Sequence, residues 1–264
     1  MVFGLLKPKT KQFDPLKASG PPGKRAYAIG DVHGRDDLLG DLLREIRSHN
    51  ARRGSAETHI VFLGDLIDRG PESRQVIERL IDGAPANETW WFVKGNHEEA
   101  IVRGLSGEPN LLPDWLKHGG YDTAESYGLD KGALMGQPDH AIEHLLLSSI
   151  PQSHVAFLSR FNETIRFGDY LFVHAGIKPG VAPEQQSGKD LRWIRAEFLN
   201  SEANFGCIVV HGHTISESVE IKTNRVGVDT GAYKTGVLSA FWIEEDKTGT
   251  LQVSGAPDSS FTDV

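Results

Sequence analysis

The sequence has very little cysteine and no long apolar stretch, and both shortages narrow the class of protein. Its 264 residues include a single cysteine, Cys207, so an internal disulfide and a cysteine-rich zinc module are excluded. No apolar run approaches the roughly 20 residues that a membrane-spanning helix needs. The first residues also lack the apolar centre and cleavage site of a signal peptide. We therefore expect a cytoplasmic protein that does not bind membranes.

Basic residues are also in the minority. The chain has 28 Lys and Arg against 36 Asp and Glu, which gives a net charge of −8 and argues against a broad nucleic-acid-binding face. Internal repeats and interior low-complexity linkers are missing as well, so we expect one domain over residues 24–255. A flexible arm (1–23) and a polar tail (256–264) would flank it. No interaction stripe is evident, so a monomer is the default expectation.

What the chain does have is histidine, with 11 residues in an acidic protein. Either these are scattered surface residues, or some of them hold metal together with carboxylates. The apolar pattern alternates between short runs that predict buried strands and helical spacing that predicts helices at 36–47, 71–81 and through much of 97–160. This order predicts an α/β layered domain with a mixed sheet or two sheets. Strands are predicted at 25–30, 58–63, 90–94, 164–167, 171–173, 208–210, 219–221, 225–228 and 237–242.

Five of the predicted strands end in His, Asp or Asn beside glycine. In α/β sheets ligands bind outside the carboxyl ends of strands, so we expect these five loops to form one site. The five segments read GDVHG (30–34), GDLIDRG (64–70), GNHE (95–98), HAG (174–176) and GHT (212–214), the last of them directly after His211.

The residue types in these loops suit a pair of divalent metal ions. Asp31 and His33 are two residues apart on an extended strand end, so their side chains point to one side and can hold one ion. Asp65 can lend one oxygen to each of two ions and bridge them. This mixture of nitrogen and oxygen ligands favours Mn, Fe or Zn over Ca or Mg. The second ion would be completed by Asn96, His174 and His213.

Together, the five segments resemble the calcineurin-like metallophosphoesterases, and within them the phosphoprotein phosphatase branch with its small bacterial and phage serine/threonine phosphatases. The resemblance implies a four-layer αββα sandwich of two mixed sheets with a dinuclear metal site at the strand ends. It places Asp31, His33 and Asp65 on the first metal, most naturally Mn²⁺. The second metal would be held by Asp65, Asn96, His174 and His213.

The resemblance also implies how a phosphomonoester would be hydrolysed. A hydroxide bridging the metals would attack phosphorus directly, and His97, oriented by Asp68, would protonate the leaving oxygen. Arg69 and Asn96 would bind the phosphate. A second phosphate-binding arginine follows a Trp-x-Arg pattern, which selects Arg195, with Arg192 as the alternative.

The substrate is the open question at this point. A phosphoprotein serine/threonine phosphatase, with tyrosine activity as an extension, is favoured by GDLIDRG and by GNHE. The alternative is a nucleotide hydrolase that splits dinucleoside polyphosphates, because that sister group shares the GDxHG, GD and GNH elements. A non-catalytic phosphate-binding module is the third reading, and the complete set of ligands, acid and arginines argues against it.

Overall fold

The computed structural model describes residues 13–256. Its first five-stranded sheet combines strands from the start of the chain with the last two strands. Its strand order is β10-β9-β1-β2-β3. The first three strands of the chain run parallel, and Lys24 of β1 pairs with Glu57 of β2 at the start of their register. β9 runs antiparallel to β1, and β10 pairs antiparallel with β9 at the edge of the sheet. The strands are β1 (Lys24–Ile29), β2 (Glu57–Phe62), β3 (Glu88–Phe92), β9 (Val237–Glu244) and β10 (Lys247–Ser254).

A second five-stranded sheet comes from the back half of the chain. Its order is β4-β5-β6-β8-β7, with three parallel strands in the centre and an antiparallel strand at each edge. Both sheets are therefore mixed, and in each the parallel strands lie side by side. The strands are β4 (Ile165–Phe167), β5 (Tyr170–Phe172), β6 (Ile208–His211), β7 (Glu220–Ile221) and β8 (Arg225–Gly227).

Alternation along the strands builds three apolar layers. In β1, Ala26 and Ala28 face the second sheet, where they share a cluster with Phe172. Tyr27 and Ile29 point the other way, into a large cluster under the helices of the first sheet. Because successive side chains of a strand point to opposite faces, a strand buried on both sides reads as an unbroken apolar run.

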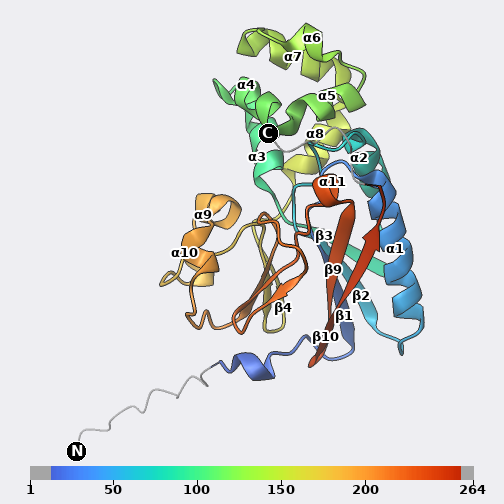
Figure 1. The fold of residues 1–264 in the computed structure, drawn as a ribbon, viewed down its shortest axis with the longest axis vertical. Helices are drawn as coiled ribbons and strands as arrows, with labels where there is room; N and C mark the ends of the chain where they lie inside the picture. Colours follow the sequence, from blue (N-terminus) through green and yellow to red (C-terminus); the bar gives the residue numbers. More distant parts are fainter. Residues whose placement is uncertain (1–12, 257–264) are drawn as a thin grey trace, which may run out of the picture.

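Helices cover the outer face of each sheet (Figure 1). α1 (Asp36–Ala51) packs against β9 and β10, and α2 (Ser73–Ile81) lies beside it. On the second sheet, Leu191 and Phe198 from α9 and α10 pack against Leu171 and Val173. The remaining helices are α3 (Asn96–Gly104), α4 (Leu111–Trp115), α5 (Tyr121–Ser126), α6 (Lys131–Leu134), α7 (Asp139–Ser149), α8 (Gln152–Ser159), α9 (Gly188–Trp193), α10 (Ala196–Leu199) and α11 (Ala232–Thr235), with the short turns η1 (Pro15–Lys17), η2 (Leu116–Gly120) and η3 (Pro183–Gln185).

The predicted α/β four-layer class is confirmed, with one strand that the sequence pattern missed. The nine predicted strands correspond to β1–β9, with ends that shift by one or two residues. β10 was not predicted, because its side chains alternate between exposed and half-buried and the segment KTGTLQVS carries few apolar residues. Its eight residues pair with β9 along their whole length, from Lys247 opposite Glu244 to Ser254 opposite Val237.

The described part of the predicted N-terminal arm makes specific contacts with the domain. The backbone N–H of Ser19 donates to the Asp169 carboxylate over 3.0 Å, and Gly20 donates to the Glu245 carbonyl over 2.9 Å. Ala18, just before these two residues, is buried in the apolar cluster that contains Phe172. Residues 13–23 are thus held against the domain, while 1–12 of the predicted arm and 257–264 of the predicted tail lie outside the described residues.

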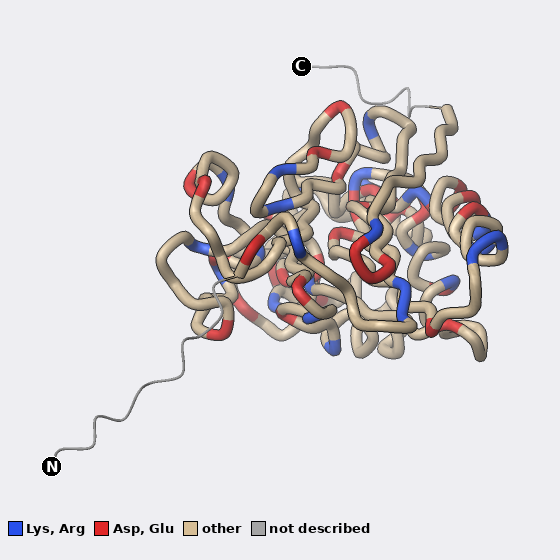
Figure 2. The backbone as a smooth tube through the Cα atoms, turned by 90° about the horizontal axis from the view of Figure 1, so that it is seen from below, with Lys and Arg blue, Asp and Glu red and all other residues tan. Residues whose placement is uncertain are grey.

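Charged residues of both signs are interspersed along the described chain (Figure 2). Acidic and basic residues occur on most elements, and they do not separate into one acidic and one basic half. Over residues 13–256, the structure contains no helix that is both long and apolar enough to span a bilayer.

Candidate metal centre

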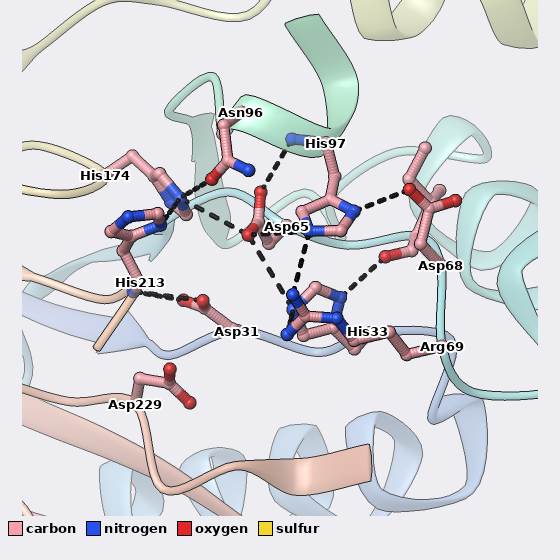
Figure 3. A network of polar contacts seen from close by, with 12 residues as sticks. Asp31, His33, Asp65, Asp68, Arg69, Asn96, His97, His174, His213 and Asp229 are labelled. Carbon is pink, nitrogen blue, oxygen red and sulfur yellow. Dashed lines mark hydrogen bonds and ion pairs between the residues drawn. The ribbon is translucent and has the colours of Figure 1, made fainter. Parts of the chain in front are cut away.

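The carboxyl ends of five strands deliver the predicted site residues to one place (Figure 3). β1 is followed by Asp31, β2 by Asp65, β5 by His174 and β6 by His213, while Asn96 opens α3 directly after β3. All of these side chains are at least nine-tenths buried. The structure therefore brings together the predicted residues Asp31, His33, Asp65, Asp68, Arg69, Asn96, His97, His174 and His213.

Hydrogen-bond acceptors converge around His174. Its Nδ1 lies 2.8 Å from the Leu63 carbonyl and must carry the ring proton of the neutral form, which leaves Nε2 as an acceptor. That Nε2 faces Asn96 Oδ1 at 2.9 Å, His213 Nδ1 at 3.1 Å and Asp65 Oδ2 at 3.3 Å. Acceptors that face one another in a buried space are what a cation would satisfy. As metal ligands, these four groups are two imidazoles, an amide and a carboxylate, a set that suits a transition metal such as Mn, Fe or Zn.

A second group of potential ligands shares Asp65 with the first. His33, Asp65 and His97 each offer an atom within 4.8 Å of the others, as do Asp65, His174 and His213. His33 Nδ1 lies 2.8 Å from the Ile67 carbonyl, so its free Nε2 faces the interior of the site, 3.7 Å from Asp65 Oδ2. Two adjacent clusters with a common carboxylate are the arrangement of a dinuclear site.

Asp31 lies beside these clusters without joining either of them in this conformation. Its two carboxylate oxygens accept the backbone N–H of His213 over 3.2 and 3.0 Å. Burial, together with the charges of Asp229 and Asp65, raises the pKa of Asp31 well above its usual range. A buried carboxylate surrounded by other carboxylates needs a compensating cation to stay ionised.

The acidity of the ligands follows from their surroundings. Burial alone would raise the pKa of Asp65, but the imidazoles of His174 and His97 outweigh it and hold that pKa well below its usual value. Burial lowers the pKa of His213 to about 2 and, with the charge of Arg69, also lowers the pKa of His33. Burial thus keeps His213 and His33 neutral while Asp65 is ionised, as metal binding requires, whereas the charge of Asp65 outweighs burial and raises the pKa of His174.

His97 is oriented by a hydrogen bond to Asp68. Its Nδ1 lies 2.6 Å from Asp68 Oδ2, and both groups are buried. Burial alone would lower the pKa of His97, but the charge of Asp65 and the bond to Asp68 outweigh it and raise that pKa. The other ring nitrogen, Nε2, faces the interior of the site, where Arg69 Nη2 approaches it to 3.3 Å. Such a pair can hold and deliver a proton at Nε2.

Left-handed backbone conformations concentrate in these loops. Among the described residues other than glycine, seven have positive φ, and five of them lie here: His33, Asp65, Asp68, Arg69 and His213. Such conformations are sparsely populated by residues with a side chain and persist only where the surrounding structure holds them.

Glycine is required at two close approaches to the carboxylates. A Cβ at Gly95 would lie 2.1 Å from Asp65 Oδ1, and one at Gly212 would lie 2.0 Å from Asp31 Oδ1. The absence of a side chain at these two positions is what lets the carboxylates occupy the site.

The two candidate phosphate-binding arginines in the Trp-x-Arg segment have different surroundings. Arg192 is largely buried and pairs with Glu99 over 2.7 Å and with Glu163. Arg195 instead reaches neutral oxygens, the His213 carbonyl and Thr214 Oγ1, each over 3.3 Å. It lines the cavity above the metal centre, and Arg192 does not.

Arg69 contacts two histidines of the site and an aromatic ring beside it. Its Nη1 approaches His33 Nε2 to 3.1 Å, and its guanidinium carbon lies 4.9 Å from the centre of the Tyr233 ring. The same tyrosine ring packs edge-on against His33, with the ring centres 5.2 Å apart. A contact of an arginine with an aromatic face limits where the guanidinium can move.

Several residues that support the site were missed by the sequence interpretation. Glu98 is fully buried, and its carboxylate accepts the backbone N–H groups of Asp65, Leu66 and Gly95 over 2.8–3.0 Å. It thereby ties the loop after β2 to the loop after β3. Its place inside the GNHE segment could have identified Glu98 as a residue of the site.

Asp68 is held by two further residues that the sequence interpretation did not single out. Trp115 Nε1 donates to Asp68 Oδ2 over 2.7 Å, and Thr123 Oγ1 donates to Asp68 Oδ1 over 2.5 Å. These residues lie 47 and 55 positions from Asp68 in the sequence, so no local pattern points to them.

A cavity of about 350 Å³ opens above the metal centre. Its floor includes Asp65, Asn96, His97 and His213, and Arg69 and Arg195 line it as well. Residues of α4 and η2 also line the cavity, as does Trp193 at the end of α9. This volume is at the lower end of the range for small-molecule sites, so it can hold a phosphate and the group attached to it.

Comparisons with known proteins agree with this geometry. The family model described as calcineurin-like phosphoesterase matches residues 24–237. "Serine/threonine-protein phosphatase 2" of Escherichia coli strain K12 is 27% identical over 235 residues, which covers 84% of this chain and 94% of that protein. "Bis(5'-nucleosyl)-tetraphosphatase PrpE [asymmetrical]" of Halalkalibacterium halodurans is 39% identical over 231 residues, 82% of this chain and 89% of that protein.

A solved structure shows the same fold at lower identity. The cold-active protein-tyrosine phosphatase of a psychrophilic Shewanella species superposes with a TM-score of 0.55 at 20% identity, over 94% of this chain and 87% of that one. The named relatives thus divide between protein phosphatases and nucleosyl tetraphosphatases.

Proposed function

The chain belongs to the calcineurin-like phosphoesterase family, and on that premise we propose that it is a metal-dependent phosphatase that removes phosphate from phosphoproteins. The observation that carries this proposal is the carboxylate of Asp65, which two buried ligand clusters share, together with the pairing of His97, a member of one cluster, with Asp68. The relative named as a serine/threonine-protein phosphatase supports the choice of substrate. So do the exposed side chains of Asp114, His118 and Trp193 at the outer edge of the cavity, which leave it open to a large partner.

Two divalent ions would be held by residues of this chain alone. Asp31, His33 and Asp65 would serve one ion, and Mn²⁺ fits this mixture of nitrogen and oxygen ligands. When bound, such ions lower the pKa of a coordinated water and offset negative charge on the phosphoryl group. The second ion would take Asp65, Asn96, His174 and His213.

The remaining residues of the site would bind phosphate and move a proton. Arg195 carries its charge into the cavity without a carboxylate partner among the described residues, which favours it over Arg192 as a phosphate ligand. An ion held by His33 would compete with the contact between Arg69 and His33 and so free Arg69 for phosphate. His97 would hold a proton at Nε2 and deliver it to the leaving oxygen, with Asp68 fixing the ring.

A second candidate is hydrolysis of dinucleoside polyphosphates. The relative named as a nucleosyl tetraphosphatase is the more identical of the two sequence relatives described above, at 39%. Every role proposed above would serve this reaction equally well, because both reactions transfer a phosphoryl group to water.

Parallel assays separate the two candidates. The protein with Mn²⁺ would be given a phosphoserine peptide and diadenosine tetraphosphate at matched concentrations. Our proposal predicts the larger kcat/KM for the peptide, and a larger value for the dinucleotide would replace it with the second candidate.

His97→Ala tests the proton-transfer step. We expect kcat to fall by about 10²–10⁴-fold on phosphoesters with poor leaving groups and by much less on those with good ones. His144→Ala, at an exposed position of α7, is the matched control and should behave as wild type. Equal losses on both classes of leaving group would exclude His97 as the acid.

A further inference from the structure

Trp193 is a large aromatic residue left half exposed beside the metal centre. Its relative exposure is 49%, although most apolar side chains of this size gain free energy by burial. It ends α9 and lines the same cavity as Asn96, His97 and Arg195. We therefore expect a bound ligand to cover this indole at the wall of the candidate active site.

The indole is held in a fixed orientation. Its Nε1 donates to Glu99 Oε2 over 3.1 Å, and the other oxygen of Glu99 accepts from Arg192 over 2.7 Å and from Arg103 over 3.1 Å. The edge of the ring is thus bonded to a carboxylate that two arginines hold in place. A rigid aromatic surface loses little conformational entropy when a ligand packs against it.

Trp193 lies close to the metal ligands. This limits how many atoms can separate phosphorus from an aromatic ring of the substrate that contacts Trp193. The centre of the Trp193 ring lies 6.3 Å from the centre of the His213 ring, with the two planes nearly perpendicular at 80°. In an aryl phosphate a single ester oxygen separates the ring from phosphorus. In a nucleotide, the sugar lies between the base and the phosphate and carries the base farther away. A ring that contacts Trp193 while its phosphate lies at the metal centre therefore matches an aryl ester.

We propose that Trp193 is a stacking platform for the phenol ring of phosphotyrosine. This inference rests on the proposed phosphatase function and narrows its substrate class. Leu111 and Trp115, which line the same cavity, add further apolar side chains. Hydrolysis would use one water, break the bond between phosphorus and the phenol oxygen, and release tyrosine and inorganic phosphate without any other reactant.

Binding measurements test the platform without turnover. Phenylphosphonate and methylphosphonate share the charged group and differ in the ring, so we expect the Mn²⁺-loaded protein to bind phenylphosphonate about two- to tenfold more tightly. Trp193→Ala should abolish that difference and Trp193→Phe should keep most of it. Trp91→Ala, which removes another partly exposed tryptophan (39%) from β3, is the control and should leave the difference unchanged.

Two results of the binding experiment would overturn the proposal. One is equal affinity of the wild-type protein for the two phosphonates. The other is loss of the difference in Trp193→Phe as well as in Trp193→Ala, which would assign the effect to the hydrogen bond with Glu99 instead of the ring.

Turnover then separates this inference from the proposed function. Peptides of one sequence that carry phosphotyrosine or phosphoserine would be compared, and Trp193→Ala should lower the ratio of their kcat/KM values by about two- to tenfold. An unchanged ratio would contradict the platform. Absence of turnover on both peptides, with the phosphonate difference intact, would reject the phosphoprotein substrate, and phosphotyrosine with it, and would leave Trp193 as a binding surface for other aryl phosphates only. If Trp193→Ala lowered kcat/KM for diadenosine tetraphosphate but for neither peptide, the ring that stacks on Trp193 would be a nucleobase. That result would overturn the phosphotyrosine assignment.

Discussion

Replacing Thr123 by valine tests whether a helix far along the chain holds the candidate acid in place. Thr123 lies in α5 and is buried, and its hydroxyl donates to Asp68 Oδ1 over 2.5 Å. The hydroxyl oxygen of Thr123 also accepts the backbone N–H of Asp68 over 2.9 Å. Valine keeps nearly the same shape, so the change removes the hydroxyl from a buried carboxylate and leaves little empty space.

The expected magnitude follows from these contacts. A hydrogen bond to a charged group contributes about 1.5–3 kcal/mol, and the Asp68 backbone N–H retains Ser73 Oγ as a partner at 2.9 Å. We therefore expect Thr123→Val to lower the free energy of unfolding by about 2 kcal/mol. A loss of positioning of the same size would lower kcat/KM by roughly 30-fold, mainly on substrates with poor leaving groups.

Denaturant unfolding and steady-state kinetics on one protein preparation would measure both effects. Thr123→Ser is the matched variant, because it retains the hydroxyl and loses only a methyl group, so its activity should stay near that of wild type. A Thr123→Val protein with unchanged stability and unchanged kinetics would refute the assignment of Asp68 as a residue braced by α5.

Three further predictions concern the loops around the site. Gly95→Ala places a Cβ 2.1 Å from Asp65 Oδ1, so we expect a loss of about 1–3 kcal/mol in stability and a lower metal content, measured by thermal unfolding and elemental analysis. Arg195→Ala should lower kcat/KM by about 10–100-fold while unfolding is little changed, whereas Arg192→Ala, which removes a largely buried cationic partner from both Glu99 and Glu163, should mainly lower stability; the opposite pattern would exchange their roles. Burial lowers the pKa of His211 to about 4 in the folded state, below its unfolded value of about 6.5, so the unfolded chain takes up the proton first. In the presence of chelator, stability should therefore fall by about 3 kcal/mol more in wild type than in His211→Gln as the pH drops from 7 to 4, and parallel pH profiles would contradict this.

The part of the site that the sequence could predict is the part carried by strand ends. Asp31, Asp65 and His174 each follow an apolar run and have a glycine within two residues, so position along the chain already indicates position at a sheet edge. The two buried sheets could be predicted for the same reason, because strands such as β1 and β6 are apolar on both faces. Regular alternation and burial are local properties, and local properties are visible in one sequence.

What could not be predicted depends on contacts between distant segments. Trp115 and Thr123 lie on helices whose own pattern explains their burial, and only the tertiary fold shows that both reach Asp68. β10 escaped prediction because one of its faces is open to solvent and its sequence has few apolar residues. The choice between Arg192 and Arg195 also required the fold, since it depends on which of them Glu99 neutralises.

The central claim is that two ions share the Asp65 carboxylate, and metal content measures it most directly. The protein would be loaded with Mn²⁺, freed of excess metal and analysed for metal per chain, beside Asp65→Asn and a His144→Ala control. The account predicts two ions per chain in wild type and control, and a loss of metal from both positions in Asp65→Asn. A wild-type protein that holds one ion or none, or an Asp65→Asn protein that still holds two, would contradict the shared-carboxylate site.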